Sequence, residues 1–245
     1  MAIDFNGDRE IRLLSVNVGQ PRQIGFHRGH PVVSAIFKEP VEVEAISLDW
    51  LNLDGDRQAD PKHHGGRDKA VYAYSADHFP SWSAELGEDP PFVPASFGEN
   101  LTVDGWNEDT VQIGDIWSWG EAQLQVVQPR IPCYKLGIRS GRPQILKRFI
   151  ETGRTGWYLR VLQPGTASVA GPIHLAERDP AGVTVRDAHL ARMPGERLVG
   201  EMERVAAVPA LAEGWREMIL ELIEREVVGQ GLYRGIGRDE QRPID

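Results

Sequence analysis

Short stretches in which apolar and polar residues alternate make up much of residues 11–176. Alternation with a period of two is typical of half-buried strands. Glycine and proline separate these stretches, and few long helical patterns interrupt them. This spacing predicts a closed or nearly closed β-barrel. The strands that we expect cover residues 11–18, 40–46, 70–73, 101–103, 111–113, 116–119, 122–127 and 173–176.

Two helices are expected inside this region, over residues 75–86 and 143–151. The second begins with Pro143, at a helix start where the missing amide hydrogen costs least. The predicted fold class is therefore mainly β with α, a barrel that also carries helices.

After residue 180 the apolar positions change to the helical period. Thr184 and Asp187 approximate a capping box, and apolar residues at 198, 202 and 205 share one helix face. A longer apolar stripe begins at Trp215, and we expect its helix to end at Gly229. These patterns predict a barrel domain over 1–178, a small three-helix extension over 179–235 and a flexible tail over 236–245.

The extension is too small to fold alone, so we expect it to dock on the barrel or on another subunit. The apolar stripe of its last helix makes a homodimer an expectation. The chain has 245 residues, of which 41% are hydrophobic, and no apolar run approaches the roughly 20 residues that span a membrane. The N-terminus lacks the pattern of a signal peptide, so we expect a cytoplasmic protein that binds no membrane.

A formal net charge of −9 disfavours binding to nucleic acid polymers, which requires a basic face. The single cysteine, Cys133, excludes an internal disulfide. It lies in the segment 128–135, which two prolines stiffen, between Arg130 and Lys135. Nearby cations favour a thiolate. The residues alone leave four roles open: a buried apolar side chain, a nucleophile, a zinc ligand, or a ligand to a softer metal.

A glycine-rich segment covers residues 62–72 and follows the motif at 55–57. Adjacent glycines let backbone amides converge on an oxyanion, and Arg57 and Lys69 are close in sequence. A plain turn with solvated charges is the alternative. The pairs His63 and His64, and His27 and His30, suggest zinc only weakly, because adjacent side chains of an extended segment point to opposite faces.

Glu99 and Asn100 directly precede the expected strand 101–103. An acceptor beside an amide matches the hydrogen-bonding edge of a pterin or purine. An ordinary turn before a strand explains the same pair.

Taken together and in this order, the motifs of the chain resemble the MOSC domain, and within it the YiiM-like group. The resemblance extends over about residues 11–176, and the segment 184–228 resembles the three-helix extension of that group. The motifs that carry it are Gly55-Asp56-Arg57, His64-Gly65-Gly66-Arg67-Asp68-Lys69-Ala70, Phe97-Gly98-Glu99-Asn100-Leu101, Gly114-Asp115 and Gln128-Pro129-Arg130-Ile131-Pro132-Cys133-Tyr134-Lys135.

The resemblance implies a MOSC-type β-barrel that binds the molybdenum cofactor (molybdopterin), with Cys133 as the metal ligand. It further implies reduction of N-hydroxylated small molecules, including hydroxylaminopurines, with electrons from a separate flavoprotein. The implied catalytic residues are Cys133 and His64, with His64 as the proton donor. The implied cofactor-binding residues are Arg57, His64, Gly65, Gly66, Asp68, Lys69, Gly98, Glu99, Asn100, Gln128, Arg130 and Lys135.

No flavin or haem motif is visible, and the chain has no room for the pyridoxal-phosphate domain that eukaryotic sulfurases of this family carry. Neither that cofactor nor flavin nor haem is therefore expected. Two alternatives stay open. One is a cofactor carrier that uses the same cysteine without turnover, and the other is a metal-free sulfur-transfer enzyme with Cys133 as nucleophile.

Overall fold

The computed structural model describes residues 10–60, 65–193 and 198–236, with side chains up to residue 226. The strands are β1 (Glu10–Val18), β2 (Arg22–His27), β3 (His30–Ser34), β4 (Glu39–Pro40), β5 (Ala45–Leu48), β6 (Val71–Ser75), β7 (Leu101–Asp104), β8 (Ile116–Trp119), β9 (Ala122–Pro129), β10 (Trp157–Gln163), β11 (Gly165–Ser168) and β12 (Ile173–Glu177). The tail was expected over 236–245: Ile236 is the last residue of α7, and residues 237–245 lie outside the described residues.

The helices are α2 (Phe79–Leu86), α3 (Tyr134–Ser140), α4 (Ile145–Thr152), α5 (Val185–Leu190), α6 (Val199–Ala206) and α7 (Glu213–Ile236). Short 3₁₀ turns, η1 (Arg67–Lys69) and η2 (Ala76–His78), flank β6. No helix in the described part of the chain is long and apolar enough to cross a membrane.

The main sheet closes on itself. Its strand order is β12-β8-β9-β10-β6-β7-β1-β4, and β12 also pairs with β1. Seven of these strands therefore form a ring within the described residues, and β4 pairs with β1 outside it. The β6–β7 pair is parallel, and the other neighbours in the ring are antiparallel. The predicted barrel with helices is confirmed, and closure leaves the ring without an unpaired edge.

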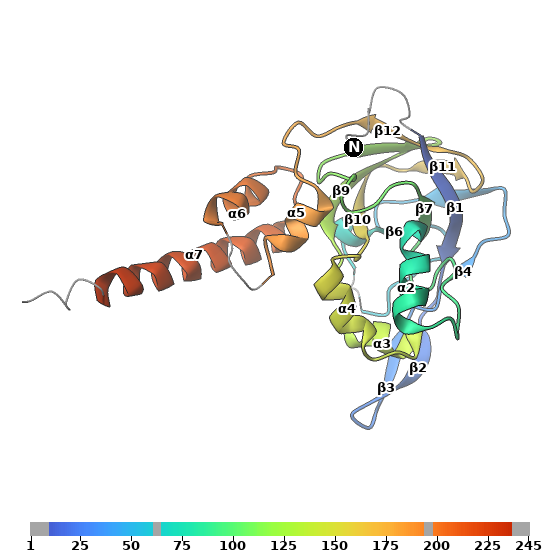
Figure 1. The fold of residues 1–245 in the computed structure, drawn as a ribbon. Helices are drawn as coiled ribbons and strands as arrows, with labels where there is room; N and C mark the ends of the chain where they lie inside the picture. The colour runs from blue at the N-terminus through green and yellow to red at the C-terminus, as the bar shows by residue number, and fades with distance from the viewer. Residues whose placement is uncertain (1–9, 61–64, 194–197, 237–245) are drawn as a thin grey trace, which may run out of the picture.

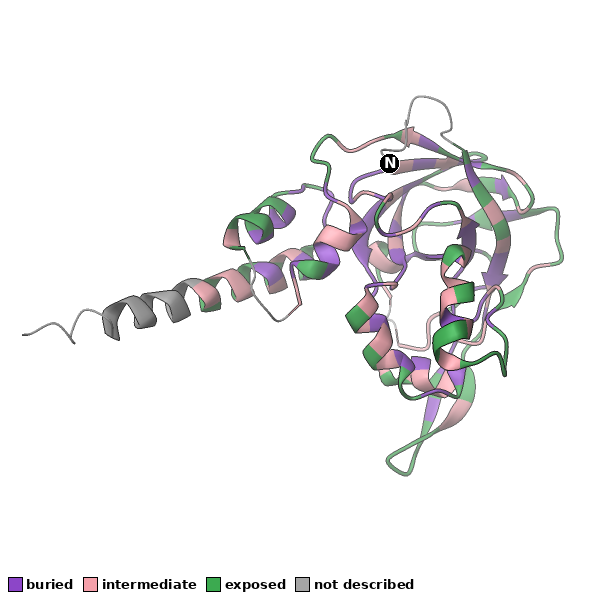
Figure 2. Ribbon diagram, in the orientation of Figure 1, coloured by how far each residue is buried: buried purple, intermediate pink, exposed green. Residues whose placement is uncertain are grey.

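The hairpin β2–β3 and the helices α2, α3 and α4 lie at one end of the barrel (Figure 1). Between the barrel and these helices is an aromatic cluster that includes Tyr72, Tyr74, Trp82, Phe97 and Phe149. The purple segments of Figure 2 show that buried residues line the barrel interior. This packing fixes the loops at that end of the barrel, where the site described below lies.

The C-terminal helices α5, α6 and α7 lie on another side of the barrel, and α7 runs away from it (Figure 1). Met202, Trp215 and Ile219 belong to the same buried cluster as the barrel interior. The amide of Ala212 also donates to the carbonyl of Val127 at 3.0 Å. The extension therefore shares the barrel core.

Several expected elements differ from the structure. Residues 111–113 form an isolated β-bridge rather than a strand: Gln112 lies opposite Thr184, the amide of Ile113 donates to the carbonyl of Val183, and the amide of Val185 donates to that of Val111. The segment 40–46 is divided between β4 and β5, and the β2–β3 hairpin, β10 and α3 were not expected.

The helix boundaries show one confirmation and one error. The capping box of Thr184 and Asp187 is present in both directions and starts α5. However, α7 passes through Gly229 and ends at Ile236, so the predicted end is wrong. A glycine inside a helix costs only about 1 kcal/mol, which a long helix tolerates.

Candidate functional site

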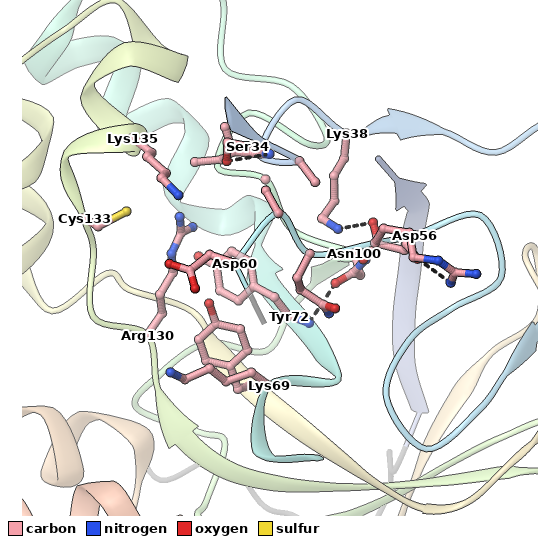
Figure 3. Close-up of a pocket in the computed structure, with 17 residues that line it drawn as sticks. Ser34, Lys38, Asp56, Asp60, Lys69, Tyr72, Asn100, Arg130, Cys133 and Lys135 are labelled. Atoms are coloured by element: carbon pink, nitrogen blue, oxygen red, sulfur yellow. Dashed lines mark hydrogen bonds and ion pairs between the residues drawn. The ribbon is translucent and has the colours of Figure 1, made fainter. Parts of the chain in front are cut away.

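A pocket opens beside the loop that carries Cys133 (Figure 3). It encloses about 640 Å³, part of it open to solvent. Its described lining includes five cationic side chains and two carboxylates, which makes it positive in a chain of net charge −9. The lining residues are Ser34, Ala35, Ile36, Lys38, Asp56, Arg57, Gln58, Ala59, Asp60, Lys69, Tyr72, Gly98, Asn100, Arg130, Cys133, Lys135 and Tyr158.

Cys133 directly precedes α3, its backbone is in the extended conformation, and its side chain makes no capping hydrogen bond. Its backbone carbonyl accepts from the amide of Leu136, which begins the helix. The sulfur points into the pocket from the same side as Lys135 and Arg130 (Figure 3). The thiol is thus held by its backbone and remains available to a ligand.

Arg130 is buried and immobilised. Its Nη1 donates to the carbonyl of Phe97 at 2.5 Å, and its guanidinium lies 4.5 Å from the ring centre of Tyr72. Burial opposes the charge, but the hydroxyls of Tyr72 and Tyr158 and the sulfur of Cys133 raise the pKa of Arg130. The guanidinium therefore stays positive next to the cysteine.

On the other side of the pocket in Figure 3, Lys38 meets Asp56. Asp56 also accepts from the amide of Gly19 at 2.8 Å and from Nδ2 of Asn100 at 3.0 Å. Asn100 accepts from the amide of Tyr72 at 3.1 Å, so these groups join the pocket wall to β6. The side chains of Asn100 and Asp56 are therefore fixed by hydrogen bonds within the protein, and the side-chain amide of Asn100 positions this wall of the pocket.

Glu99 lies behind the pocket wall and is fully buried. Its carboxylate accepts from the amides of Ala95 and Phe97, at 2.8 and 3.0 Å, and from the hydroxyl of Thr102 at 3.0 Å. Burial raises the pKa of Glu99, and these hydrogen bonds oppose the rise. In this structure Glu99 holds the loop that precedes β7 and is not among the described lining residues, and its role of recognising a heterocycle stays a prediction.

The remaining predicted residues are divided. Lys69 lines the pocket, whereas Asp68 accepts a bond of 2.6 Å from Nε of Arg160. Gly65 and Gly66 are not among the described lining residues. Gly98 lines the pocket at a φ of 77°, whereas Gln128 is buried and is not among the described lining residues. His64 lies outside the described residues, so its role as proton donor stays a prediction.

Sequence reasoning missed several lining residues. Most of them come from segments without a recognisable motif, chiefly the connection after β3 and residues 58–60. Asp56 and Tyr72 instead belong to segments that the sequence analysis singled out. For the others, only the alternation of residues 157–161 offered a signal, since it places Tyr158 on one face of a strand. The missed residues are Ser34, Ala35, Ile36, Lys38, Asp56, Gln58, Ala59, Asp60, Tyr72 and Tyr158.

Comparison with known proteins agrees with this geometry. The model of the MOSC domain family matches residues 60–174. Protein YiiM of Escherichia coli is 40% identical over 193 residues, which cover 78% of this chain and 84% of YiiM. The chain belongs to the MOSC domain family. The crystal structure of YiiM from Geobacillus stearothermophilus superposes with a TM-score of 0.72 at 32% identity, covering 87% of this chain and 99% of that one.

A further relative of this MOSC protein is a Gibberella moniliformis protein named "Reductase". It is 38% identical over 168 residues, which cover 68% of this chain but only 29% of the relative. MOSC domains are associated with the molybdenum cofactor, so the chain is a YiiM-like MOSC protein related to that cofactor.

Among the residues that the structure describes, no cluster of three histidine, cysteine, aspartate or glutamate side chains is placed to hold a metal ion. His27 and His30 therefore belong to no such cluster. His63 and His64 lie outside the described residues. In the described pocket, the sulfur of Cys133 lies among cationic side chains.

Proposed function

We propose that this protein is a molybdenum-cofactor-dependent reductase of N-hydroxylated compounds such as hydroxylaminopurines. The observation that carries the proposal is the sulfur of Cys133 in the wall of a cation-lined pocket of a MOSC protein. The Gibberella relative named "Reductase" supports this class of reaction.

The residues present fit the cofactor. A cysteine sulfur suits a soft, sulfur-rich metal centre. The cationic side chains suit the phosphate and the anionic dithiolene of a pyranopterin. Cys133 would be the protein ligand to molybdenum, and Arg57, Lys69 and Arg130 would contact the phosphate and pterin.

When bound, the cofactor supplies a centre for two-electron oxygen transfer. The net reaction adds two electrons and two protons to the hydroxylamine, breaks its N–O bond, and yields an amine and water. Arg130 provides a fixed positive charge beside Cys133, because Phe97 and Tyr72 immobilise it. The aromatic cluster behind Tyr72 excludes water from that wall of the pocket.

The reaction requires a source of electrons and a source of protons. We propose that a separate flavoprotein delivers the electrons, because the sequence carries no flavin or haem motif of its own. His64 remains our candidate for proton delivery, since an imidazole titrates near neutral pH. The variant His64→Gln tests this role through the pH profile of the turnover number.

The deciding experiment is metal and pterin analysis of the protein and of Cys133→Ala, both produced in a host that makes the cofactor. We expect near-stoichiometric molybdenum in the parent. In the variant we expect a changed molybdenum spectrum or a marked loss of metal, and a loss of at least about 100-fold in oxidation of a reduced dye by 6-hydroxylaminopurine. Surface Lys147→Ala on α4 is the control and should match the parent.

Four outcomes contradict the proposal. Absence of molybdenum and pterin from protein made in the cofactor-producing host, or a centre unchanged in Cys133→Ala, excludes the ligand role. Bound molybdenum without dye oxidation indicates a cofactor carrier. Activity that survives without molybdenum, together with alkylation of Cys133 in the apo-protein, indicates metal-free sulfur transfer.

A further inference from the structure

The contact between Lys38 and Asp56 is the most buried ion pair at the described pocket. The side chains are 9% and 2% exposed, and both residues line the cavity. A buried ion pair is weak support for stability, because desolvation of both charges offsets their attraction. A pair at this position therefore needs another explanation.

The carboxylate of Asp56 is already well supplied with donors. It accepts from the amide of Gly19 and from the side chain of Asn100, in addition to Lys38. The carboxylate would thus remain hydrogen-bonded without the lysine. Its position relative to β6 is set by Asn100, which in turn binds the amide of Tyr72.

The ammonium of Lys38 is less completely paired. An ammonium carries three N–H donors, and among the described residues Asp56 is its hydrogen-bond partner. Burial lowers the pKa of Lys38, against the attraction of Asp56 and Glu99, and Arg130 lowers it further. An anion in the pocket would satisfy the remaining donors and relieve this cost.

A second cation lies beside the pair. Arg57 directly follows Asp56, and its Nη1 donates to the carbonyl of Asp56 at 3.0 Å. Arg57 is exposed at the surface and also lines the pocket. In the view of Figure 3, Lys38 and Asp56 lie across the cavity from Cys133. The pocket thus has a sulfur at one side and a buried lysine with a neighbouring arginine at the other.

We propose that Lys38, held by Asp56, anchors the phosphate-bearing end of the cofactor on the side of the pocket that faces Cys133. The inference rests on the cofactor part of the proposed function and adds an anchoring residue to it. The recognised chemistry is a phosphate monoester, which accepts from the ammonium while Asp56 keeps the lysine in place. Asp56 is a positioning residue, because it acts through Lys38.

The test uses two variants. In the double variant Lys38→Met/Asp56→Asn the charges are removed together, so no unpaired buried charge remains. In Lys38→Arg the positive charge and its bond to Asp56 are kept. The control is Lys147→Met, which changes a lysine that is 79% exposed on α4. Circular dichroism checks that each variant is folded.

Two readouts do not depend on activity. The first is the content of molybdenum and pterin in proteins from a cofactor-producing host. The second is calorimetric binding of inorganic phosphate and pyrophosphate to protein from a host that makes no cofactor. In the double variant we expect the cofactor content and the affinity for phosphate and pyrophosphate each to fall about tenfold or more, because a hydrogen bond to a charged group is lost. Lys38→Arg and Lys147→Met should remain within about threefold of the parent.

Normal loading and normal phosphate affinity of the folded double variant overturn the inference. If the double variant does not fold, Lys38→Gln decides by the same two readouts, since its amide still donates to Asp56 but carries no charge. A parent that holds the cofactor without reducing hydroxylaminopurine ends the reductase proposal and leaves the Lys38 inference standing. Loss of loading in Lys38→Arg equal to that in the double variant also overturns it.

Discussion

The imidazole of His27 stacks on the phenol ring of Tyr134, with ring centroids 4.3 Å apart and planes inclined by 25°. His27 is the last residue of β2, and Tyr134 directly follows Cys133. Both rings are exposed, and Tyr134 retains 40% of its surface. The β2–β3 hairpin, which projects from the barrel in Figure 1, is therefore tied to the residue next to the sulfur.

This contact predicts the effect of His27→Ala. A two-stranded hairpin is only marginally stable by itself, and an aromatic pair contributes about 0.5–1.5 kcal/mol. We expect faster hydrogen exchange of the amides in 22–34 and little change in overall unfolding. Mass spectrometry of hydrogen exchange measures this. His30→Ala is the control, since His30 has no ring contact in the described structure, and equal exchange in both variants would contradict the role of the stack.

A second prediction concerns Gly98, which has a φ of 77°. A Cβ there would lie 2.6 Å from Cγ1 of Ile36 and 2.9 Å from its carbonyl oxygen. Gly98→Ala should therefore destabilise the fold by about 3 kcal/mol or more and displace the Ile36 wall of the pocket.

Gly29→Ala is the matched control for that clash. Its φ is 81°, but a Cβ there would meet nothing within 4 Å, so it reports the backbone cost alone, about 1 kcal/mol. Urea unfolding of the two variants measures the difference. Equal losses would show that the contact with Ile36 does not matter.

A third prediction concerns Asn100, whose side chain joins three segments. It accepts from the amide of Tyr72 and donates to the carbonyl of Asn17 and to Asp56. Asn100→Ala leaves buried groups unpaired, and we expect the free energy of unfolding to fall by about 3 kcal/mol. Asn107→Ala changes a surface turn and should cost less than about 1 kcal/mol. Comparable losses in urea unfolding would contradict this assignment.

The fourth prediction concerns pH. His189 is buried in α5, and its Nε2 donates to the carbonyl of Ile150 at 2.8 Å. Burial lowers the pKa of His189, with help from Arg186 and Arg192. The unfolded residue binds a proton near pH 6.5, so the unfolded chain takes up more protons as the pH falls through that value. The contribution of His189 to stability is present above about pH 6.5 and is lost as the pH falls to the folded pKa.

Urea unfolding of the parent and of His189→Gln at pH 7.5, 6 and 5 measures this effect. The glutamine amide still donates to Ile150 but does not titrate, so the variant should lose less stability on acidification. His174→Gln, at an exposed position of β12, is the control and should follow the parent. Parallel pH dependence of the parent and His189→Gln would exclude His189 as the cause.

Much of the fold could be read from local pattern. Alternation identified β1, β7, β8, β9 and β12, because a strand with one face in the core must alternate. The capping box of Thr184 was readable because it depends on residues three positions apart. The helix α3 was not readable, since seven residues between a proline-rich loop and Gly141 carry too little periodicity.

The site was only partly readable. The motifs contain Arg57, Lys69, Arg130 and Cys133, and all four line the pocket. Conversely, Glu99 belongs to a motif but faces the interior, where three donors hold its carboxylate. A motif identifies a residue as a candidate for the site, but whether its side chain points into the pocket or into the interior depends on how the loop packs.

The sequence by itself determined that the chain forms a mainly β protein with a helical extension and a single cysteine in a stiff loop beside two cations. These properties depend on neighbours along the chain. Only the tertiary structure decided that β12 closes the ring against β1 and that Lys38 meets Asp56 in the pocket. Such contacts join segments far apart in sequence, and their energy depends on burial and pairing that local periodicity does not encode.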